Sequence, residues 1–255
     1  GMTAAGFRKG DIIQNTFSYH LTPAGFMFDG AARSLGCVVV PAGTGQTDLQ
    51  VQIAADVGVT GYTGTPSFLY ALLKRGREVD RKLNIEVAFV SGEMLPNSLR
   101  DELENDFGVR VLQGYGIADL GLVAYECAEK KGMHLHHNCI VEIIDIATGN
   151  RCAPGEVGEV VVTVFDEAYP LIRFGTGDLS SVMEEATCAC GRTSPRLAGW
   201  LGRVGDAVKV RGLFIRGSQI DGVMKNFPEV VRYQAIVTRE DHRDELHYCV
   251  ELKNS

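Results

Sequence analysis

The sequence predicts an α/β fold, in which a parallel sheet with flanking helices precedes a small antiparallel β-barrel and then part of a small α+β C-terminal lid domain. In the first half, short apolar runs alternate with helical patterns, which is typical of parallel β-α-β units. After Glu126, strand-like runs follow one another with only glycine, asparagine or proline turns between them. From Gly202 onward, one helical stretch precedes two strands that a charged turn joins.

The elements of the first half follow from periodicity and from helix-starting residues. Leu49, Ile53 and Val57 share one helical face, and Pro66 stands in the first turn of the next helix. The expected strands are residues 36–41, 58–62, 85–90 and 109–113, and the expected helices are residues 48–57, 66–77 and 95–107. Ligands of parallel sheets bind at the carboxyl ends of the strands, so site residues are expected there.

In the second half of the chain, the sequence pattern predicts antiparallel strands and a separate C-terminal region. The expected strands are residues 141–144, 159–163, 169–173, 233–237 and 246–252, with a helix over residues 219–226 and a turn over residues 239–245. We expect a core over residues 1–202, divided into an α/β subdomain of about 11–125 and a barrel of about 130–201. Residues 203–255 would begin a mobile C-terminal domain.

Composition excludes several classes of protein. Hydrophobic residues make up 45% of the chain and charged residues 22%, which excludes intrinsic disorder. A net charge of −7 provides no basic surface for nucleic acid, and no apolar run reaches the roughly 20 residues that cross a membrane. The chain starts without the apolar core of a signal peptide, and Gly1 before Met2 is typical of a residue left by tag cleavage. Seven cysteines in that setting favour free thiols or a metal site in the cytoplasm.

Two glycine turns follow predicted strands. In Ser91–Pro96 a strand ends and a helix begins, so backbone N–H groups can face a ligand. In Gly114–Asp119 the glycines admit a planar ligand, Tyr115 can stack on it, and Asp119 can hold a divalent cation. The alternative interpretations are an ordinary β-α turn and a glycine turn with a packed tyrosine.

Two later segments also carry candidate site residues. Asp178 follows a strand and a Gly-x-Gly turn, where its carboxylate can accept hydrogen bonds from ribose hydroxyls or simply cap the turn. Residues 202–212 place glycines on both sides of a short strand, which suits either an interdomain hinge or a surface turn.

In this order the segments resemble the motifs of the adenylate-forming superfamily of acyl-CoA synthetases, above all those of its phenylacetate-CoA ligase branch. Ser91–Pro96 is similar to the Gly-Ala/Gly-Glu loop of that branch, and Tyr115–Asp119 to its Tyr-Gly-x-Ser/Thr-Glu motif. Pro170–Asp178 is similar to its Pro-Leu/Val-Ile-Arg-Tyr-x-Thr-x-Asp segment. Gly202–Gly212 and Ser218–Ile220 resemble its hinge and the Pro-Ser-Gln-Ile-Glu that follows. The resemblance runs from about residue 12 to the end of the chain.

The resemblance implies a two-step ligase that uses ATP, Mg²⁺ and coenzyme A. A substrate carboxylate attacks the α-phosphate of ATP and releases pyrophosphate, and the thiol of coenzyme A then displaces AMP from the acyl-adenylate. By resemblance, Gly92 and Glu93 border the adenine, and Tyr115, between Gly114 and Gly116, stacks on it.

The resemblance also assigns roles to four charged residues. Asp178 would bind the ribose hydroxyls and Arg203 would lie near the ribose or phosphate. Asp119 would hold Mg²⁺, and Asp206 would be the pivot about which the small domain rotates between the two half-reactions.

Departures from the family pattern limit what this chain is expected to do by itself. Ala118 stands where the family has Ser or Thr, and Asp119 stands where it has Glu, which alters Mg²⁺ ligation. The family's phosphate loop has no counterpart before Asp11, and its catalytic lysine segment has none before Ser255. We therefore expect the middle and late part of a longer ligase, inactive in adenylation when alone.

A metal site is predicted from cysteine and histidine spacing. The tight Cys188-x-Cys190 turn can bring two thiolates together, and Cys127 with His134 would complete a tetrahedral set. Four protein ligands make the expected Zn²⁺ structural rather than catalytic. His136 or His137 could replace His134, and three unlinked cysteines with a surface histidine are the alternative.

An aromatic-rich stretch, residues 17–28, corresponds to the acyl pocket in the resembled branch. Tyr19 and Phe26 are the candidate walls for an aromatic acid, although a helix face packed into the core is the alternative for each. The complete protein is expected to join an aryl acid such as phenylacetate to coenzyme A in the cytoplasm. The alternatives are an enzyme of the same branch that adenylates another molecule, such as a deazaflavin coenzyme, and a non-catalytic nucleotide- or acyl-binding protein. No nucleic-acid or membrane partner is expected, and a homodimer is among the assemblies that stay open.

Overall fold

The computed structural model divides into two compact units. It describes residues 1–185, 187–210, 213–240 and 243–253. The first unit comprises Gly1–Thr176 with Ser180–Trp200, and the second comprises Gly177–Leu179 with Leu201–Ser255. The two units are described separately below.

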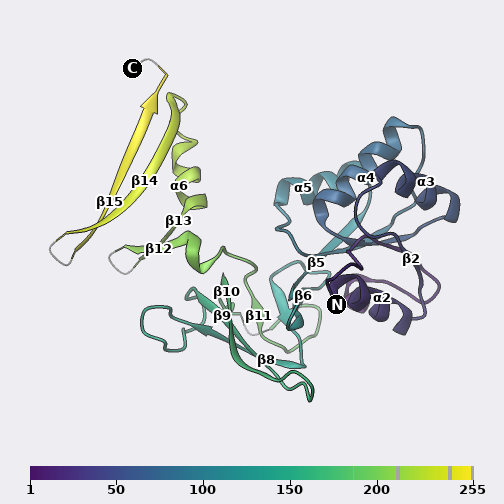
Figure 1. Cartoon of the computed structure of the whole chain (residues 1–255), viewed down its shortest axis with the longest axis horizontal. Coiled ribbons are helices and arrows are strands. Elements are labelled where there is room, and N and C mark those ends of the chain that lie inside the picture. Colours follow the sequence, from purple (N-terminus) through teal and green to yellow (C-terminus); the bar gives the residue numbers. More distant parts are fainter. Residues whose placement is uncertain (186, 211–212, 241–242, 254–255) are drawn as a thin grey trace. The chain divides into compact units, whose positions relative to one another are not determined.

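The first unit is built on a sheet of eight strands. They are β1 (Ile12–Asn15), β2 (Val38–Pro41), β3 (Gly61–Gly64), β4 (Val87–Val90), β5 (Arg110–Ile117), β6 (Gly121–Glu126), β7 (Met133–Leu135) and β11 (Arg196–Leu197). Their order across the sheet is β11-β7-β6-β5-β4-β3-β1-β2 (Figure 1). Strands β1 to β5 pair in parallel, whereas β5 pairs with β6, β6 with β7 and β7 with β11 in antiparallel fashion. Strand β5 is therefore the position at which the sheet changes direction.

Helices cover both faces of the parallel part. They are α1 (Met2–Ala5), α2 (Ala24–Ser34), α3 (Thr47–Val57), α4 (Pro66–Glu78) and α5 (Asn97–Asp101), which continues into the π-helical turn η1 (Glu102–Asp106). Figure 1 shows α3 and α4 on one side of the sheet and α2 on the other. Over the stretches that the structure describes, no helix has the length and apolar character needed to cross a membrane.

The alternation of side chains along β4 explains this layering. Ala88 and Val90 pack into a core with residues of α3, α4 and the α5 region, while Val87 and Phe89 pack into a second core with α1 and α2. Successive side chains of a strand point to opposite faces, so a strand covered on both sides must be apolar throughout. The apolar run predicted as a buried strand at 85–90 meets this requirement.

A third core joins the antiparallel part of the large sheet to a smaller one. Strands β8 (Cys139–Ile144), β9 (Gly158–Val164) and β10 (Leu171–Ser180) form a sheet in the order β10-β9-β8, with β8 and β9 antiparallel. Val141, Ile143, Val160 and Val162 of this sheet pack with Val123 and other residues of β6, β7 and β11. The region predicted as a barrel thus consists of two packed sheets with one core, and the α/β class is confirmed.

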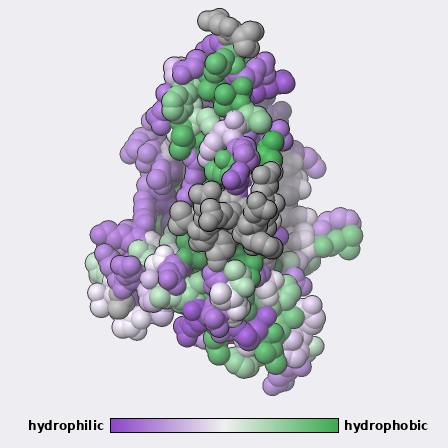
Figure 2. Space-filling model, turned by 90° about the vertical axis from the view of Figure 1, so that its left-hand side faces the viewer, coloured by the Kyte–Doolittle hydropathy of each residue, from purple (hydrophilic) through white to green (hydrophobic). Residues whose placement is uncertain are grey.

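The second unit is small and rich in hairpins. After the 3₁₀ turn η2 (Val204–Asp206) it contains β12 (Ala207–Val210), β13 (Leu213–Arg216), α6 (Gly217–Met224), β14 (Val230–Glu240) and β15 (Arg243–Leu252). Both strand pairs are antiparallel, and the pairing of β14 with β15 continues to Glu240 and Arg243, so the predicted turn over 239–245 is shorter than expected. Figure 2 shows apolar residues among polar ones in the upper part of the molecule, where this hairpin lies. The exposed apolar side chains of the hairpin include Tyr233, Ile236, Tyr248, Val250 and Leu252. The predicted domain boundary at residue 203 stays a prediction.

Three elements near the start of the chain, α1, β1 and α2, were not predicted. Strand β1 lies inside the parallel sheet, yet its sequence ends in two polar residues, Gln14 and Asn15. Both are buried: Gln14 Nε2 donates to Gln50 Oε1 at 2.7 Å, and Asn15 Nδ2 donates to the carbonyl oxygen of Gly25 at 2.8 Å. Because polar side chains with hydrogen-bond partners elsewhere in the chain occupy half of this strand, it lacks the apolar pattern that would have revealed it.

A buried ion pair marks the change of sheet direction. Arg100 of α5 donates two hydrogen bonds to the carboxylate of Glu126 on β6, at 2.8 and 2.9 Å, and a third to the carbonyl oxygen of Val111 on β5. Glu126 also accepts hydrogen bonds from the backbone N–H and the side-chain amide of Gln113. The side chains of Arg100 and Glu126 are only 11% and 5% exposed. One carboxylate therefore connects a helix with both strands of the β5–β6 hairpin.

We expect Arg100→Met to lower the free energy of unfolding by about 3–5 kcal/mol, because the carboxylate of Glu126 stays buried without its cation. Arg75→Met is the matched control, since Arg75 pairs with Asp48 at the surface and such pairs contribute less than about 1 kcal/mol. Urea unfolding followed by circular dichroism measures both. Equal losses for the two variants would contradict the role of the buried pair.

Candidate functional site

The glycine turn after β4 meets the second predicted glycine segment, at the carboxyl end of β5. Strand β5 continues to Ile117, so Gly114 and Gly116 lie in the strand and not in the expected turn, which begins at Ala118. Gly92, just after β4, has a φ of +82°, a left-handed conformation that favours glycine. Ser91 beside it is buried, and its hydroxyl donates to the carbonyl oxygen of Gly114 at 2.8 Å. The two predicted motifs are thus joined directly by a hydrogen bond between neighbouring strand ends.

The glycines of the second motif are required by close packing. A Cβ at Gly114 would lie 2.6 Å from Cζ of Phe89 and 3.0 Å from Cδ1 of Leu122. A Cβ at Gly116 would lie 2.8 Å from the carbonyl oxygen of Gly121. Both positions lie far inside van der Waals contact, so β5 approaches its neighbours only because these residues lack side chains.

A pocket of about 450 Å³ opens beside these turns. Ser91, Gly92, Gly116 and Ala118 line one part of it. The rest of the wall includes apolar side chains of the α2 region and of the strands, namely Phe17, Met27, Phe28, Phe89, Ile117 and Leu122. The arrangement can enclose an apolar ligand whose polar end lies at the glycine turns.

Tyr19 and Phe26, the predicted pocket walls, do not line this pocket. The lining residues of α2 are Ala24, Met27, Phe28 and Ala31, which recur at the spacing of one helical face. Phe26 lies off that face and is 63% exposed. In this stretch the aromatic wall of the pocket is made by Phe17 and Phe28, and the helical period of α2 could have identified Phe28.

Tyr19 instead belongs to a polar contact at the start of α2. Its hydroxyl accepts a hydrogen bond from Asn15 Nδ2 at 2.8 Å and donates to Asp29 Oδ2 at 3.1 Å. Burial, together with the Asp29 carboxylate, raises the pKa of Tyr19 to about 12. Tyr19 also packs edge-on against Phe26, with ring centroids 5.3 Å apart.

Three other predicted site residues of these segments, Glu93, Tyr115 and Asp119, do not line the pocket. Glu93 and Asp119 are exposed, on the turns after β4 and β5 respectively. Tyr115 is half-buried, pairs with Ala124 across the β5–β6 hairpin and packs against the third core. The structure therefore leaves both carboxylates accessible to a ligand, while Tyr115 is held partly by the core.

Asp178 and Arg203 form an ion pair within the second unit. Arg203 donates to Asp178 Oδ1 at 3.1 Å, with the aspartate side chain 8% exposed and the arginine 58% exposed. Leu179 N donates to the carbonyl oxygen of Gly202, which ties the two segments together through the backbone. Asp206 ends the η2 turn directly before β12. Residues 211 and 212 of the predicted hinge lie outside the described residues.

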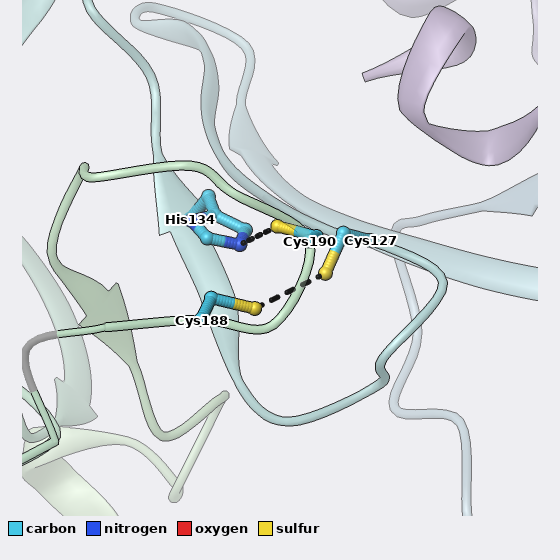
Figure 3. A group of neighbouring side chains, drawn as sticks. All are labelled: Cys127, His134, Cys188 and Cys190. Atoms are coloured by element: carbon cyan, nitrogen blue, oxygen red, sulfur yellow. Dashed lines mark hydrogen bonds between the residues drawn. The ribbon is translucent and has the colours of Figure 1, made fainter.

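Cys127, His134, Cys188 and Cys190 come together in one cluster, as Figure 3 shows. Their four ligand atoms all lie within 4.8 Å of one another. The Sγ atoms of Cys127 and Cys188 are 3.7 Å apart, and Sγ of Cys190 is 3.3 Å from His134 Nε2. A tetrahedral zinc site separates its ligand atoms by about 3.5–3.8 Å, given Zn–S and Zn–N bonds of about 2.3 and 2.0 Å. The donor set and its spacing thus suit Zn²⁺.

The surroundings of the cluster orient its histidine and shift the pKa values of two of its thiols in opposite directions. His134 Nδ1 lies 3.2 Å from Ser194 Oγ, so the ring is oriented with Nε2 toward the thiols. Burial raises the pKa of the Cys127 thiol to about 11. Burial acts in the same direction on Cys190, but hydrogen bonds from the backbone and side chain of Arg192 outweigh it and lower the pKa of that thiol to about 6. His136 and His137, the other candidate ligands, lie outside the cluster.

Arg196, which the sequence did not single out, holds the loops that carry the cluster. Its side chain is almost fully buried and donates to the carbonyl oxygens of Lys131, Glu185 and Thr187, at 2.7, 3.0 and 3.0 Å. Three backbone carbonyls on one guanidinium connect the segment after Cys127 with the segment before Cys188. These hydrogen bonds hold the two loops next to each other.

The sequence also matches a known family. The model of the family described as "AMP-binding enzyme" covers residues 10–164. The chain belongs to this AMP-binding enzyme family. It is 34% identical over 260 residues to a phenylacetate-coenzyme A ligase of Thermus thermophilus, and 30% identical over 267 residues to that of Escherichia coli. The resemblance predicted from the five motifs is therefore confirmed.

These AMP-binding relatives are longer than the chain. The Thermus alignment covers 98% of this chain but 58% of that enzyme, so the chain spans little more than half the length of its curated relatives. Among solved structures, a 2-hydroxyisobutyryl-CoA ligase in an open conformation with 2-HIB-AMP and CoA superposes with a TM-score of 0.86 and 26% identity. The superposition covers 98% of this chain and 57% of the 2-hydroxyisobutyryl-CoA ligase chain. MatB from Rhodopseudomonas palustris, at a TM-score of 0.65 and 16% identity over 99% of this chain and 52% of its own, shares the fold.

We expect Gly114→Ala to lower the free energy of unfolding by about 1–3 kcal/mol, because the added methyl group would overlap Phe89. Gly30→Ala is the matched control: a Cβ there meets no atom within 4 Å, and alanine favours the helix by about 0.5–1 kcal/mol. Urea unfolding compares the two. A Gly114→Ala protein as stable as the Gly30→Ala protein would show that the close approach is not required.

Proposed function

We propose that this chain is the acid- and nucleotide-binding part of an ATP-dependent acid–thiol ligase that works through an acyl-adenylate. The observation that carries the proposal is the apolar pocket bordered by the two glycine turns at the carboxyl ends of β4 and β5. An apolar acid in this pocket would present its carboxylate at the turns, where the nucleotide of an AMP-binding protein is expected.

The reaction would proceed in two steps. The carboxylate oxygen attacks the α-phosphorus of ATP, the bond to the bridging oxygen breaks, and pyrophosphate leaves. The thiolate of coenzyme A then attacks the acyl carbon and AMP leaves. Phosphoryl chemistry of this kind depends on positioning and on charge stabilisation more than on covalent catalysis by the protein.

Each site residue has a proposed part in this scheme. Gly92 and Glu93 border the adenine, and Tyr115 stacks on it. Asp178 accepts hydrogen bonds from the ribose hydroxyls, a role that its ion pair with Arg203 supports because the pair holds the carboxylate in a fixed position. Asp206 is the pivot of the second unit.

The exposed carboxylate of Asp119 would hold Mg²⁺, which supplies positive charge at the phosphates when bound. Ala118 beside it lines the pocket without the hydroxyl that the family pattern has at this position. A weaker phosphate contact is therefore expected here.

The proposed substrate is an aryl acid of the phenylacetate type. The phenylalanines of the pocket wall provide flat apolar surface for a ring, and the volume of about 450 Å³ falls within the range of small-molecule sites. The relatives named phenylacetate-coenzyme A ligase support the same class.

The natural full-length protein is expected to catalyse acid-dependent exchange of pyrophosphate into ATP, with aryl acids ahead of short aliphatic ones. The measurement follows the incorporation of labelled pyrophosphate into ATP with a panel of aryl and short aliphatic acids.

Asp178→Ala should weaken AMP binding by about 1.5–3 kcal/mol for each charge-assisted hydrogen bond lost. Asp221→Ala, an exposed position on α6 in the same unit, is the control. AMP binding without exchange for any acid would favour a non-catalytic binding protein.

We also propose that Cys127, His134, Cys188 and Cys190 hold a structural Zn²⁺. With all four positions taken by protein ligands, the metal would supply cohesion between the loops and no open site for substrate. The donor set, its spacing and the orientation of His134 by Ser194 support this assignment.

Protein purified without chelator should contain about one zinc per chain, and Cys188→Ser should lose most of it and unfold at a lower temperature. Cys249→Ser, at an exposed cysteine of β15 outside the cluster, should keep both metal and stability. Elemental analysis and thermal unfolding provide the two measurements. Metal-free wild-type protein would end the zinc assignment.

A further inference from the structure

Apart from backbone groups, which include the α-amino group of Gly1, the pocket wall is apolar except for a few side chains. This inference, which rests on the proposed function, concerns one of those side chains. Among the lining residues that the structure describes, Thr22, Ser91 and His136 carry polar side-chain atoms. The hydroxyl of Ser91 donates to the carbonyl oxygen of Gly114, so its proton is already used within the protein. His136 offers the one imidazole of this wall.

A backbone hydrogen bond defines which ring nitrogen of His136 carries the proton. The backbone N–H of Asn138 donates to His136 Nδ1 at 3.4 Å, which makes Nδ1 the acceptor and places the ring proton on Nε2. An N–H at the edge of an apolar pocket costs free energy when a ligand covers it without accepting its hydrogen bond. A ligand that supplies an acceptor at this position is therefore preferred over one of equal shape that does not.

Neighbouring groups hold the ring in place. His136 stacks on His137 with ring centroids 4.5 Å apart, and the edge of Tyr125 packs against it with centroids 6.4 Å apart. Its backbone N–H donates to the carbonyl oxygen of Val123 on β6 at 2.8 Å, which continues the β6–β7 pairing. Because the ring is fixed before a ligand arrives, little conformational entropy opposes its hydrogen bond.

The position of His136 separates it from the carboxylate end of the substrate. It follows β7, and β6 lies between β7 and β5, which carries Gly116. Two strand spacings place the backbone of His136 about 10 Å from that of the glycine turn. His136 therefore faces the body of a bound acid while the carboxylate lies at the turns.

We propose that His136 is a specificity-determining residue that donates Nε2–H to an acceptor on the apolar body of the acid. The substrate class is then an aryl acid whose ring contains or carries a hydrogen-bond acceptor, rather than an unsubstituted hydrocarbon ring. Pyridylacetates and phenylacetate form a matched pair for this question, because a ring nitrogen replaces a C–H without changing the shape.

The test compares the three pyridylacetate isomers with phenylacetate in pyrophosphate exchange by the natural full-length protein, at a pH where the pyridine is neutral. The best isomer should have a kcat/KM about tenfold above that of phenylacetate, the factor expected for one hydrogen bond. His136→Phe should abolish this preference, so that the best pyridylacetate and phenylacetate have equal kcat/KM values, and His136→Gln, which retains an N–H donor, should keep part of it. His136→Leu takes the place of His136→Phe if that variant does not fold.

His247→Phe is the control, because His247 is exposed on β15 and does not line the pocket. It should leave the ratio of the two kcat/KM values unchanged. A wild-type ratio near one, or a ratio unaffected by His136→Phe, would overturn the inference while leaving the proposed function intact. An equal loss for all acids in a folded His136 variant would place the histidine at the shared carboxylate and also overturn it. No exchange with any acid would overturn both proposals.

Discussion

The buried ion pair of Arg100 and Glu126 is the contact on which the site depends most. It lies where the sheet stops being parallel, and a strand at that position must satisfy two different hydrogen-bonding patterns on its two edges. Glu126 binds the backbone of β5 through Gln113 and, through Arg100, the helix packed beside it. The next residue along the chain is the metal-ligand candidate Cys127. Both the glycine-bearing end of β5 and the cysteine after β6 are thus positioned by one carboxylate.

The pocket and the metal cluster share the β6–β7 strands. Tyr125 on β6 packs near His134 of the cluster, with ring centroids 6.1 Å apart, and near His136 of the pocket wall. His134 and His136 are two residues apart on an extended segment, which places them on the same face of the sheet. Arg192, beside the cluster cysteines, lies over the ring of Tyr125 at 5.9 Å. The cluster therefore supports the wall of the pocket through direct packing.

The sequence predicted those parts of the fold whose pattern is local. The helices expected over 48–57 and 66–77 are confirmed to within one residue at each end, because amphipathic periodicity and a proline in the first turn are local signals. Strand β1 could not be predicted in this way, since Gln14 and Asn15 find their partners far away in the chain. The metal ligands were chosen by chemistry, and the structure brings all four together. Predicting the pocket wall would have required knowing which face of helix α2 points to the pocket. That face contains Phe28, whereas Phe26 is exposed.

The spacing of Ala24, Met27, Phe28 and Ala31 has an evolutionary consequence. These residues line the pocket from one face of a helix, whereas the turns proposed to meet the nucleotide follow strands β4 and β5. A mutation on that face changes the size or shape of the pocket by one side chain without moving a strand or a glycine turn. Under the proposed function, single substitutions along α2 would therefore change which acid fits the pocket, while the residues proposed to meet the nucleotide form a separate set.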